Sequence, residues 1–76
     1  MTIDDIIALI VPHTRGDVRV DARTPVLSTG VLDSYHFAAF LESIRTKAGV
    51  RIEVDEIGVD NFDTPVQMLA FLGRRR

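Results

Sequence analysis

The fold is decided by the stretch from residue 33 to residue 49, which reads DSYHFAAFLESIRTKAG. Drawn as a helix, this stretch gathers its larger apolar side chains within a sector of about 100°. The sector contains Phe37, Phe40, Leu41, Ile44 and Ala48. Asp33 and Ser34 both suit the start of a helix, and Gly49 suits the left-handed residue that ends one. We therefore predict one long amphipathic helix between these limits.

Two further helices are predicted from their own start and stop signals. Thr2 is a good N-cap before an apolar run with two acidic residues in its first turn, and Pro12 disfavours helical backbone just before it. Near the other end of the chain, Thr64 is followed by proline at the first helical position and by Gln67, which completes a capping box. Gly73 is expected to end this last helix.

The segments between these helices show little helical periodicity. Residues 12–30 carry scattered aliphatic and charged side chains, which predicts a long ordered loop, and residues 50–63 are expected to form a connector with a short helix. The predicted fold class is all-α, a small bundle of three main helices plus one short helix, with a long loop between the first two. Residues 1–73 form the single domain, and residues 74–76 are expected to be a disordered basic tail.

Composition excludes several classes of protein. The chain has 76 residues, of which 46% are hydrophobic and 26% charged, and it contains no cysteine. It therefore has no disulfide, thiolate metal site or cysteine nucleophile of its own. No apolar run approaches the roughly 20 residues of a membrane span, and no signal peptide is visible. We expect a cytoplasmic protein.

The charge distribution points away from nucleic acids. Three of the nine basic residues are in the tail, so residues 1–73 carry six basic and eleven acidic residues, a net charge of −5. Nucleic-acid affinity comes mostly from cations that neutralise phosphates, so an acidic body fits a partner with a basic patch better. The two histidines and scattered carboxylates show no metal-ligand spacing, and we expect no metal site.

Ser34 has two interpretations from its position alone. A serine at the start of a helix lies beside free backbone amides and the positive end of the helix dipole, which favours an attached phosphate. The same position equally suits an ordinary N-cap serine. Gly30 would allow a tight turn just before the helix, while Val31 and Leu32 can hold the preceding loop against the bundle.

The stretch Gly30-Val31-Leu32-Asp33-Ser34-Tyr35 resembles the Asp-Ser-Leu motif of acyl carrier proteins, with tyrosine in place of leucine. The resemblance covers nearly the whole chain, since Ile52-Glu53-Val54-Asp55-Glu56 and Asn61-Phe62-Asp63-Thr64 follow in the expected order. It is closest to the small carriers of D-alanine, other amino acids or peptidyl groups, and implies an acyl-carrier-like bundle.

By this resemblance the chain is a freestanding carrier and not an enzyme. A phosphopantetheinyl transferase would attach 4′-phosphopantetheine covalently to Ser34, and the imported thiol would hold an acyl or aminoacyl group as a thioester. The other implied partners are an adenylating or acyl-loading ligase and a downstream acyl-transfer or condensing enzyme. A dedicated secondary-metabolite, polyketide, nonribosomal-peptide or aminoacyl pathway is expected, with a fatty-acid-type carrier as the alternative.

The resemblance also implies a docking surface around the motif helix of a monomeric protein. The residues expected there are Val31, Leu32, Asp33, Tyr35, Ala38, Ala39 and Glu42. Carriers of fatty acid synthesis usually have an acidic motif helix, but here basic and neutral residues dilute the charge. Recognition should therefore depend on apolar contact more than on charge, with a modest effect of salt.

Three other functions are alternatives to a carrier role. A hydrolase built from Asp33, Ser34 and His36 is disfavoured, because residues two apart on a helix point about 200° apart. A helical adaptor that binds another protein without a prosthetic group would show a similar capped helix with a mixed outer face. A DNA-binding helical bundle is disfavoured by the acidic body.

Overall fold

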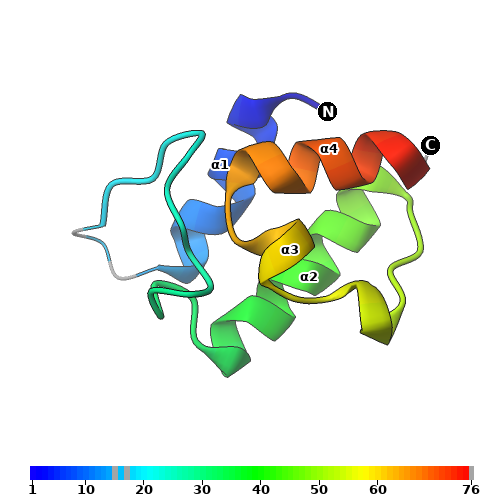
Figure 1. Ribbon diagram of the computed structural model, residues 1–76. Helices are drawn as coiled ribbons and strands as arrows, with labels where there is room; N and C mark the ends of the chain where they lie inside the picture. Colours follow the sequence, from blue (N-terminus) through cyan, green and yellow to red (C-terminus); the bar gives the residue numbers. More distant parts are fainter. Residues whose placement is uncertain (15, 17, 76) are drawn as a thin grey trace.

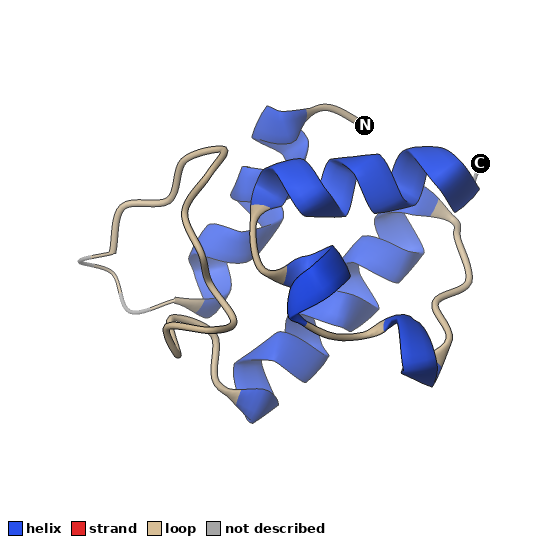
Figure 2. Cartoon of the chain, in the orientation of Figure 1, coloured by secondary structure: helices blue, strands red, loops and turns tan. Residues whose placement is uncertain are grey.

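The computed structural model describes residues 1–14, 16 and 18–75, and the regular elements in this part of the chain are all helical. They are α1 (Ile3–Ile10), η1 (Val11–His13), α2 (Ser34–Ala48), η2 (Val54–Glu56), α3 (Val59–Phe62) and α4 (Pro65–Arg75), where η marks a 3₁₀ helix. The all-α prediction, with three longer helices, one short one and a long first loop, is confirmed (Figures 1 and 2). Arg15 and Asp17 of the predicted loop and Arg76 of the predicted tail lie outside the described residues.

Local capping explains where α1 and α4 begin. The Thr2 hydroxyl accepts the Asp5 amide at 3.2 Å, and the Asp5 carboxylate accepts the Thr2 amide at 2.8 Å. At the start of α4, the Thr64 hydroxyl accepts the Gln67 amide at 3.2 Å, and the Gln67 side chain accepts the Thr64 amide at 3.0 Å. Both pairs satisfy amides at the start of a helix that would otherwise lack partners. The Thr2 cap and the Thr64–Gln67 capping box were predicted from the sequence, whereas the return bond from the Thr2 amide to Asp5 was not.

One apolar cluster joins the four α-helices and the long loop. Its buried members are Ile6, Ile10, Val26, Leu32, Phe37, Phe40, Ile44, Phe62, Met68, Phe71 and Leu72. α4 packs against α1 and α3, and α1 also packs against α2. Within the cluster the Phe62 ring lies between Phe37 and Phe71, with ring centroids 6.0 Å and 5.1 Å away. The short helix α3 therefore contributes a central core residue.

The long loop is ordered by a few contacts with the α3–α4 junction. Val26 is completely buried, and its amide donates to the Asp63 carbonyl at 2.7 Å. The Val66 amide donates to the Ala22 carbonyl at 3.0 Å, and the Leu32 amide donates to the Val26 carbonyl at 2.8 Å. Figure 1 shows the loop returning to α2 past the start of α4. The loop thus holds the beginning of α2 in place.

The end of α4 differs from the prediction. The helix continues through Gly73 to Arg75, so two residues that were placed in a basic tail form its last turn. Arg75 forms an ion pair with Glu56, and Arg74 donates to the Asn61 side chain at 3.3 Å. These contacts with η2 and α3 explain why the helix continues past glycine. No helix among the described residues is long and apolar enough to cross a membrane.

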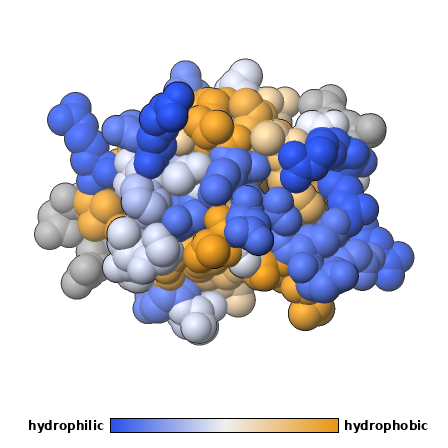
Figure 3. All heavy atoms as spheres, in the orientation of Figure 1, coloured by the Kyte–Doolittle hydropathy of each residue, from blue (hydrophilic) through white to orange (hydrophobic). Residues whose placement is uncertain are grey.

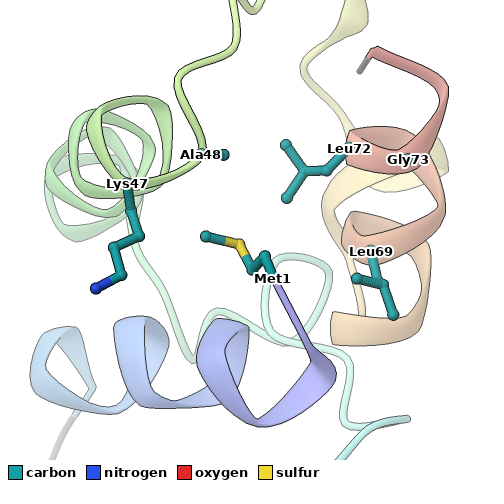
Figure 4. A pocket seen from close by; sticks show the side chains of 6 residues that line it. All are labelled: Met1, Lys47, Ala48, Leu69, Leu72 and Gly73. Atoms are coloured by element: carbon teal, nitrogen blue, oxygen red, sulfur yellow. The ribbon is translucent and has the colours of Figure 1, made fainter.

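Gly73 also lines a gap of about 150 Å³ between α4, the end of α2 and Met1 (Figure 4). A Cβ atom added at Gly73 would meet nothing within 4 Å. We expect Gly73→Ala to raise the free energy of unfolding by about 0.5–1 kcal/mol, because alanine loses less backbone entropy in a helix. Urea denaturation followed by circular dichroism measures this change.

Gly49→Ala is the matched control for this substitution. Gly49 has a φ of 66°, in the left-handed region, although its Cβ position is equally open. The same substitution there should destabilise the protein by about 1 kcal/mol, because a side chain disfavours left-handed backbone. Equal effects at both glycines would contradict the helical assignment of Gly73.

Candidate functional site

The start of α2 is capped by Asp33 and not by Ser34. Asp33 has extended backbone, and its Oδ1 atom accepts the His36 amide at 2.8 Å. Ser34 is the first helical residue and is exposed. Within the described residues, its hydroxyl makes no hydrogen bond. Of the two interpretations of this serine, the N-cap belongs to its neighbour, and the Ser34 hydroxyl is free and accessible.

The side chains of Asp33 and His36, which lie on either side of Ser34 in the sequence, are hydrogen-bonded to each other. The Nδ1 atom of His36 lies 2.8 Å from Oδ1 of Asp33, which is the same oxygen that accepts the His36 amide. These two hydrogen bonds from His36, backbone first, lower the pKa of Asp33, so the carboxylate is ionised at neutral pH. The sequence predicted free backbone amides beside Ser34. The His36 amide is instead bonded to Asp33, so it is not available to a phosphate on Ser34.

The turn before α2 has the geometry that its sequence predicted. Gly30 has a φ of 78°, and its amide donates to the Leu27 carbonyl at 3.2 Å. The Thr29 hydroxyl donates to the Pro25 carbonyl at 2.6 Å. Leu32 then enters the core, where it is 2% exposed. The backbone just before Ser34 is therefore fixed by two features, the tight turn at Gly30 and the buried side chain of Leu32.

Asp63, at the junction between α3 and α4, anchors the same loop. Its Oδ1 atom accepts the amides of Leu27 at 3.0 Å and Ser28 at 2.9 Å, and its Oδ2 atom accepts the Ser28 hydroxyl at 2.8 Å. Partial burial raises the pKa of Asp63, but the hydrogen bonds from Ser28, Leu27 and Val26 outweigh it and lower the pKa overall. Asp63 therefore holds the loop as a carboxylate.

This role of Asp63 was not predicted from the sequence. The partner Ser28 is 35 residues away along the chain. No local pattern indicates such a pairing, so only the packing of the loop against the α3–α4 junction shows it.

The predicted docking residues are only partly at the surface. Tyr35 is 78% exposed, and Asp33, Ala38 and Glu42 are also exposed, whereas Val31 and Ala39 are half-buried. The prediction that Leu32 belongs to the docking surface is wrong, because its side chain is buried in the core and too little exposed to contact a partner. Its burial follows from its role in holding the loop.

The exposed charge near this surface is partly neutralised. Arg45 donates to the Glu42 carboxylate at 2.6 Å, which gives α2 a locally mixed charge. Exposed apolar side chains also lie on η2, α3 and α4, among them Val54, Val59 and Val66. Figure 3 shows hydrophobic side chains interspersed with hydrophilic ones on the face that carries α3 and α4.

The arrangement does not assemble a hydrolytic triad. His36 is bonded to Asp33, but no hydrogen bond in the described part of the chain joins its ring to Ser34. Residues 1–14, 16 and 18–75 also contain no group of three or more His, Asp or Glu side chains that could hold a metal ion. The chemistry of this site therefore centres on one exposed, unbonded serine hydroxyl.

Comparisons with known proteins identify no family for this chain. No family model matches the chain, and no curated protein matches it.

Proposed function

We propose that the chain is a freestanding carrier protein that holds an acyl or aminoacyl intermediate. Ser34 is the attachment point, where a phosphopantetheinyl transferase moves 4′-phosphopantetheine from a nucleotide-linked donor to the serine Oγ atom. The bond between Oγ and phosphorus forms, the phosphoanhydride bond of the donor breaks, the nucleotide leaves and the Oγ proton is lost. When bound, this group supplies a thiol that carries cargo as a thioester, which the chain itself cannot do because it has no cysteine. The protein is a cytoplasmic monomer and not an enzyme in this proposal.

The observation that carries the proposal is that Asp33, and not Ser34, caps the start of α2, which leaves the Ser34 hydroxyl for the attachment. Because Asp33 caps the helix, modification of the Ser34 hydroxyl breaks none of the hydrogen bonds within residues 1–14, 16 and 18–75. The exposed side chains of Tyr35 and His36 leave its surroundings accessible to a modifying enzyme. The surroundings of Ser34 therefore fit a bulky covalent group. The resemblance of residues 30–35 to the carrier motif supports the same assignment.

The partners in this proposal are the transferase, an adenylating or acyl-loading ligase and a downstream acyl-transfer or condensing enzyme. Tyr35, Ala38 and Glu42 offer them an exposed surface on α2. Since Glu42 is paired with Arg45, docking depends more on the tyrosine ring and small apolar side chains than on net charge. This mixed surface favours a dedicated aminoacyl, peptidyl or polyketide pathway over fatty acid synthesis.

Intact-mass spectrometry after co-expression with a broad-specificity phosphopantetheinyl transferase tests the proposal. We expect the wild-type chain to gain one phosphopantetheine unit and Ser34→Ala to gain none. Ser43→Ala is the matched control, because Ser43 lies on the same helix and its hydroxyl donates locally, to the Ala39 carbonyl at 3.2 Å. It should be modified like the wild type.

Two outcomes contradict the proposal. An unmodified wild-type chain would leave a helical adaptor without a prosthetic group as the better interpretation. A mass gain that persists in Ser34→Ala would place the attachment at another residue. Circular dichroism of each variant shows whether a lost modification reflects the missing hydroxyl or a loss of folding.

A further inference from the structure

A hollow of about 270 Å³ lies beside the first turn of α2. Among the described residues, its lining consists of His13, Thr14, Gly30, Val31, Asp33 and His36. Its two walls are held together because η1 packs against α2 (Figure 1). Ser34 belongs to the same helical turn as two of the lining residues. A chain attached to this serine therefore begins next to the hollow.

The lining offers hydrogen-bonding atoms that the fold does not use. His36 contacts Asp33 through Nδ1 and its amide, and both reach the same oxygen, Oδ1. Within the described part of the chain, Nε2 of His36 and Oδ2 of Asp33 therefore make no side-chain hydrogen bond. The half-buried His13 ring makes no hydrogen bond within the described part of the chain. An imidazole can donate or accept, whereas a carboxylate only accepts.

These groups favour a neutral ligand with both N–H and C=O groups. The ionised Asp33 repels an anion, and the polar lining does not suit a long hydrocarbon chain. The volume of about 270 Å³ lies just below the range of about 300–1,000 Å³ that is usual for pockets of drug-sized molecules, so the hollow fits a small ligand. Gly30 contributes no side chain, and a Cβ atom there would meet nothing within 4 Å. The hollow thus has room for a single flexible chain.

We infer that this hollow is a resting site for the amide-bearing part of the tether on Ser34. His13 and His36 hydrogen-bond to the amides of the tether when no partner is docked, and the phosphodiester on Ser34 stays outside the hollow. The inference rests on the proposed function, which supplies the tether. It assigns binding roles to two histidines and adds no catalytic step.

Nuclear magnetic resonance of the isotope-labelled holo protein tests this assignment. We expect nuclear Overhauser effects between the tether protons and the imidazole protons of His13. We also expect differences in chemical shift between the apo and holo proteins at His13 and Thr14. In His13→Ala the shift difference at Thr14 should be lost, and His13→Gln should retain part of it because glutamine still donates and accepts. Thr46→Ala, exposed at the other end of α2, is the control and should behave like the wild type.

The outcomes separate this inference from the proposed function. A normal mass gain without any response at His13 would overturn the resting site and leave the carrier role intact. If no mass gain occurs, free pantetheine added to the unmodified protein replaces the tether as the probe. Shift changes at His13 and His36 would then still support the hollow as a binding site, and their absence would overturn it.

Discussion

Replacing Phe62 by alanine is expected to lower the free energy of unfolding by about 3–5 kcal/mol, the usual cost of removing a buried phenylalanine ring. Phe62 is completely buried, and it links α2 to α4 through an edge contact with Phe37 and a tilted ring contact with Phe71. A domain of this size has a total stability of about 0.05–0.15 kcal/mol per residue. The loss therefore approaches the whole stability of the protein.

Thermal denaturation followed by circular dichroism measures this effect. We expect the Tm of Phe62→Ala to fall by at least about 12 °C, since each kcal/mol shifts a domain of this size by roughly 4–8 °C. Val54→Ala is the control, because Val54 is 85% exposed. It should change stability by no more than about 0.5 kcal/mol. A Phe62→Ala protein as stable as this control would show that α3 does not carry the core.

Removing the Asp63 carboxylate is expected to cost at least about 2 kcal/mol, because each hydrogen bond to a charged group contributes about 1.5–3 kcal/mol. Asp63→Ala removes the acceptor for the amides of Leu27 and Ser28 and for the Ser28 hydroxyl. The loop before Ser34 would then lose its main polar attachment to the α3–α4 junction. Urea denaturation at neutral pH measures the loss.

Two milder substitutions should each lower the free energy of unfolding by less than Asp63→Ala does. Ser28→Ala removes only the hydroxyl bond and should cost about 1.5 kcal/mol, the lower end of the range for hydrogen bonds to a charged group, because Ser28 is exposed. Asp63→Asn keeps one carbonyl acceptor but no charge, so its loss should fall between those of the other two variants. If Asp63→Ala were no less stable than Ser28→Ala, the two amide contacts would contribute nothing to stability.

The Asp63 contribution should also depend on pH in a defined direction. The pKa of Asp63 is lowered in the folded protein from its ordinary value of 3.8. Its stabilisation is therefore fully present above that value and is lost as the pH falls through the lower folded pKa. The pKa values of Asp5, Asp21 and Asp33 are lowered as well, so all four act in the same direction.

Comparison of variants isolates the part that belongs to Asp63. The stability difference between the wild type and Asp63→Asn should be largest near neutral pH and should shrink below about pH 4, where aspartate begins to be protonated. Denaturation in urea at several pH values measures this difference. A difference that stays constant down to pH 2 would contradict a charged acceptor at residue 63.

Most helix limits could be predicted because helix capping is a local interaction. The pairs Thr2–Asp5 and Thr64–Gln67 join residues three apart, so the sequence shows both partners at once. The left-handed backbone of Gly49 is likewise a property of the chain near that residue. The apolar stripe of α2 indicated its buried face for the same reason.

The candidate site was only partly predictable. The motif located Ser34, but Asp33 and Ser34 were equally good caps by residue type. The tight turn at Gly30 and the burial of Leu32 set the register in which α2 begins, and this register makes Asp33 the cap. The same packing removes Leu32 from the predicted docking surface.

The amino-acid sequence by itself determined the helical class, the order of the three main helices and most of their ends, because periodicity and capping depend on residues within a few positions of one another. Only the tertiary structure decided that Asp63 anchors the loop and that α4 continues past Gly73. In both cases the stabilising partner lies far along the chain, at Ser28 for Asp63 and at Glu56 for Arg75. Such contacts form only once the bundle has folded.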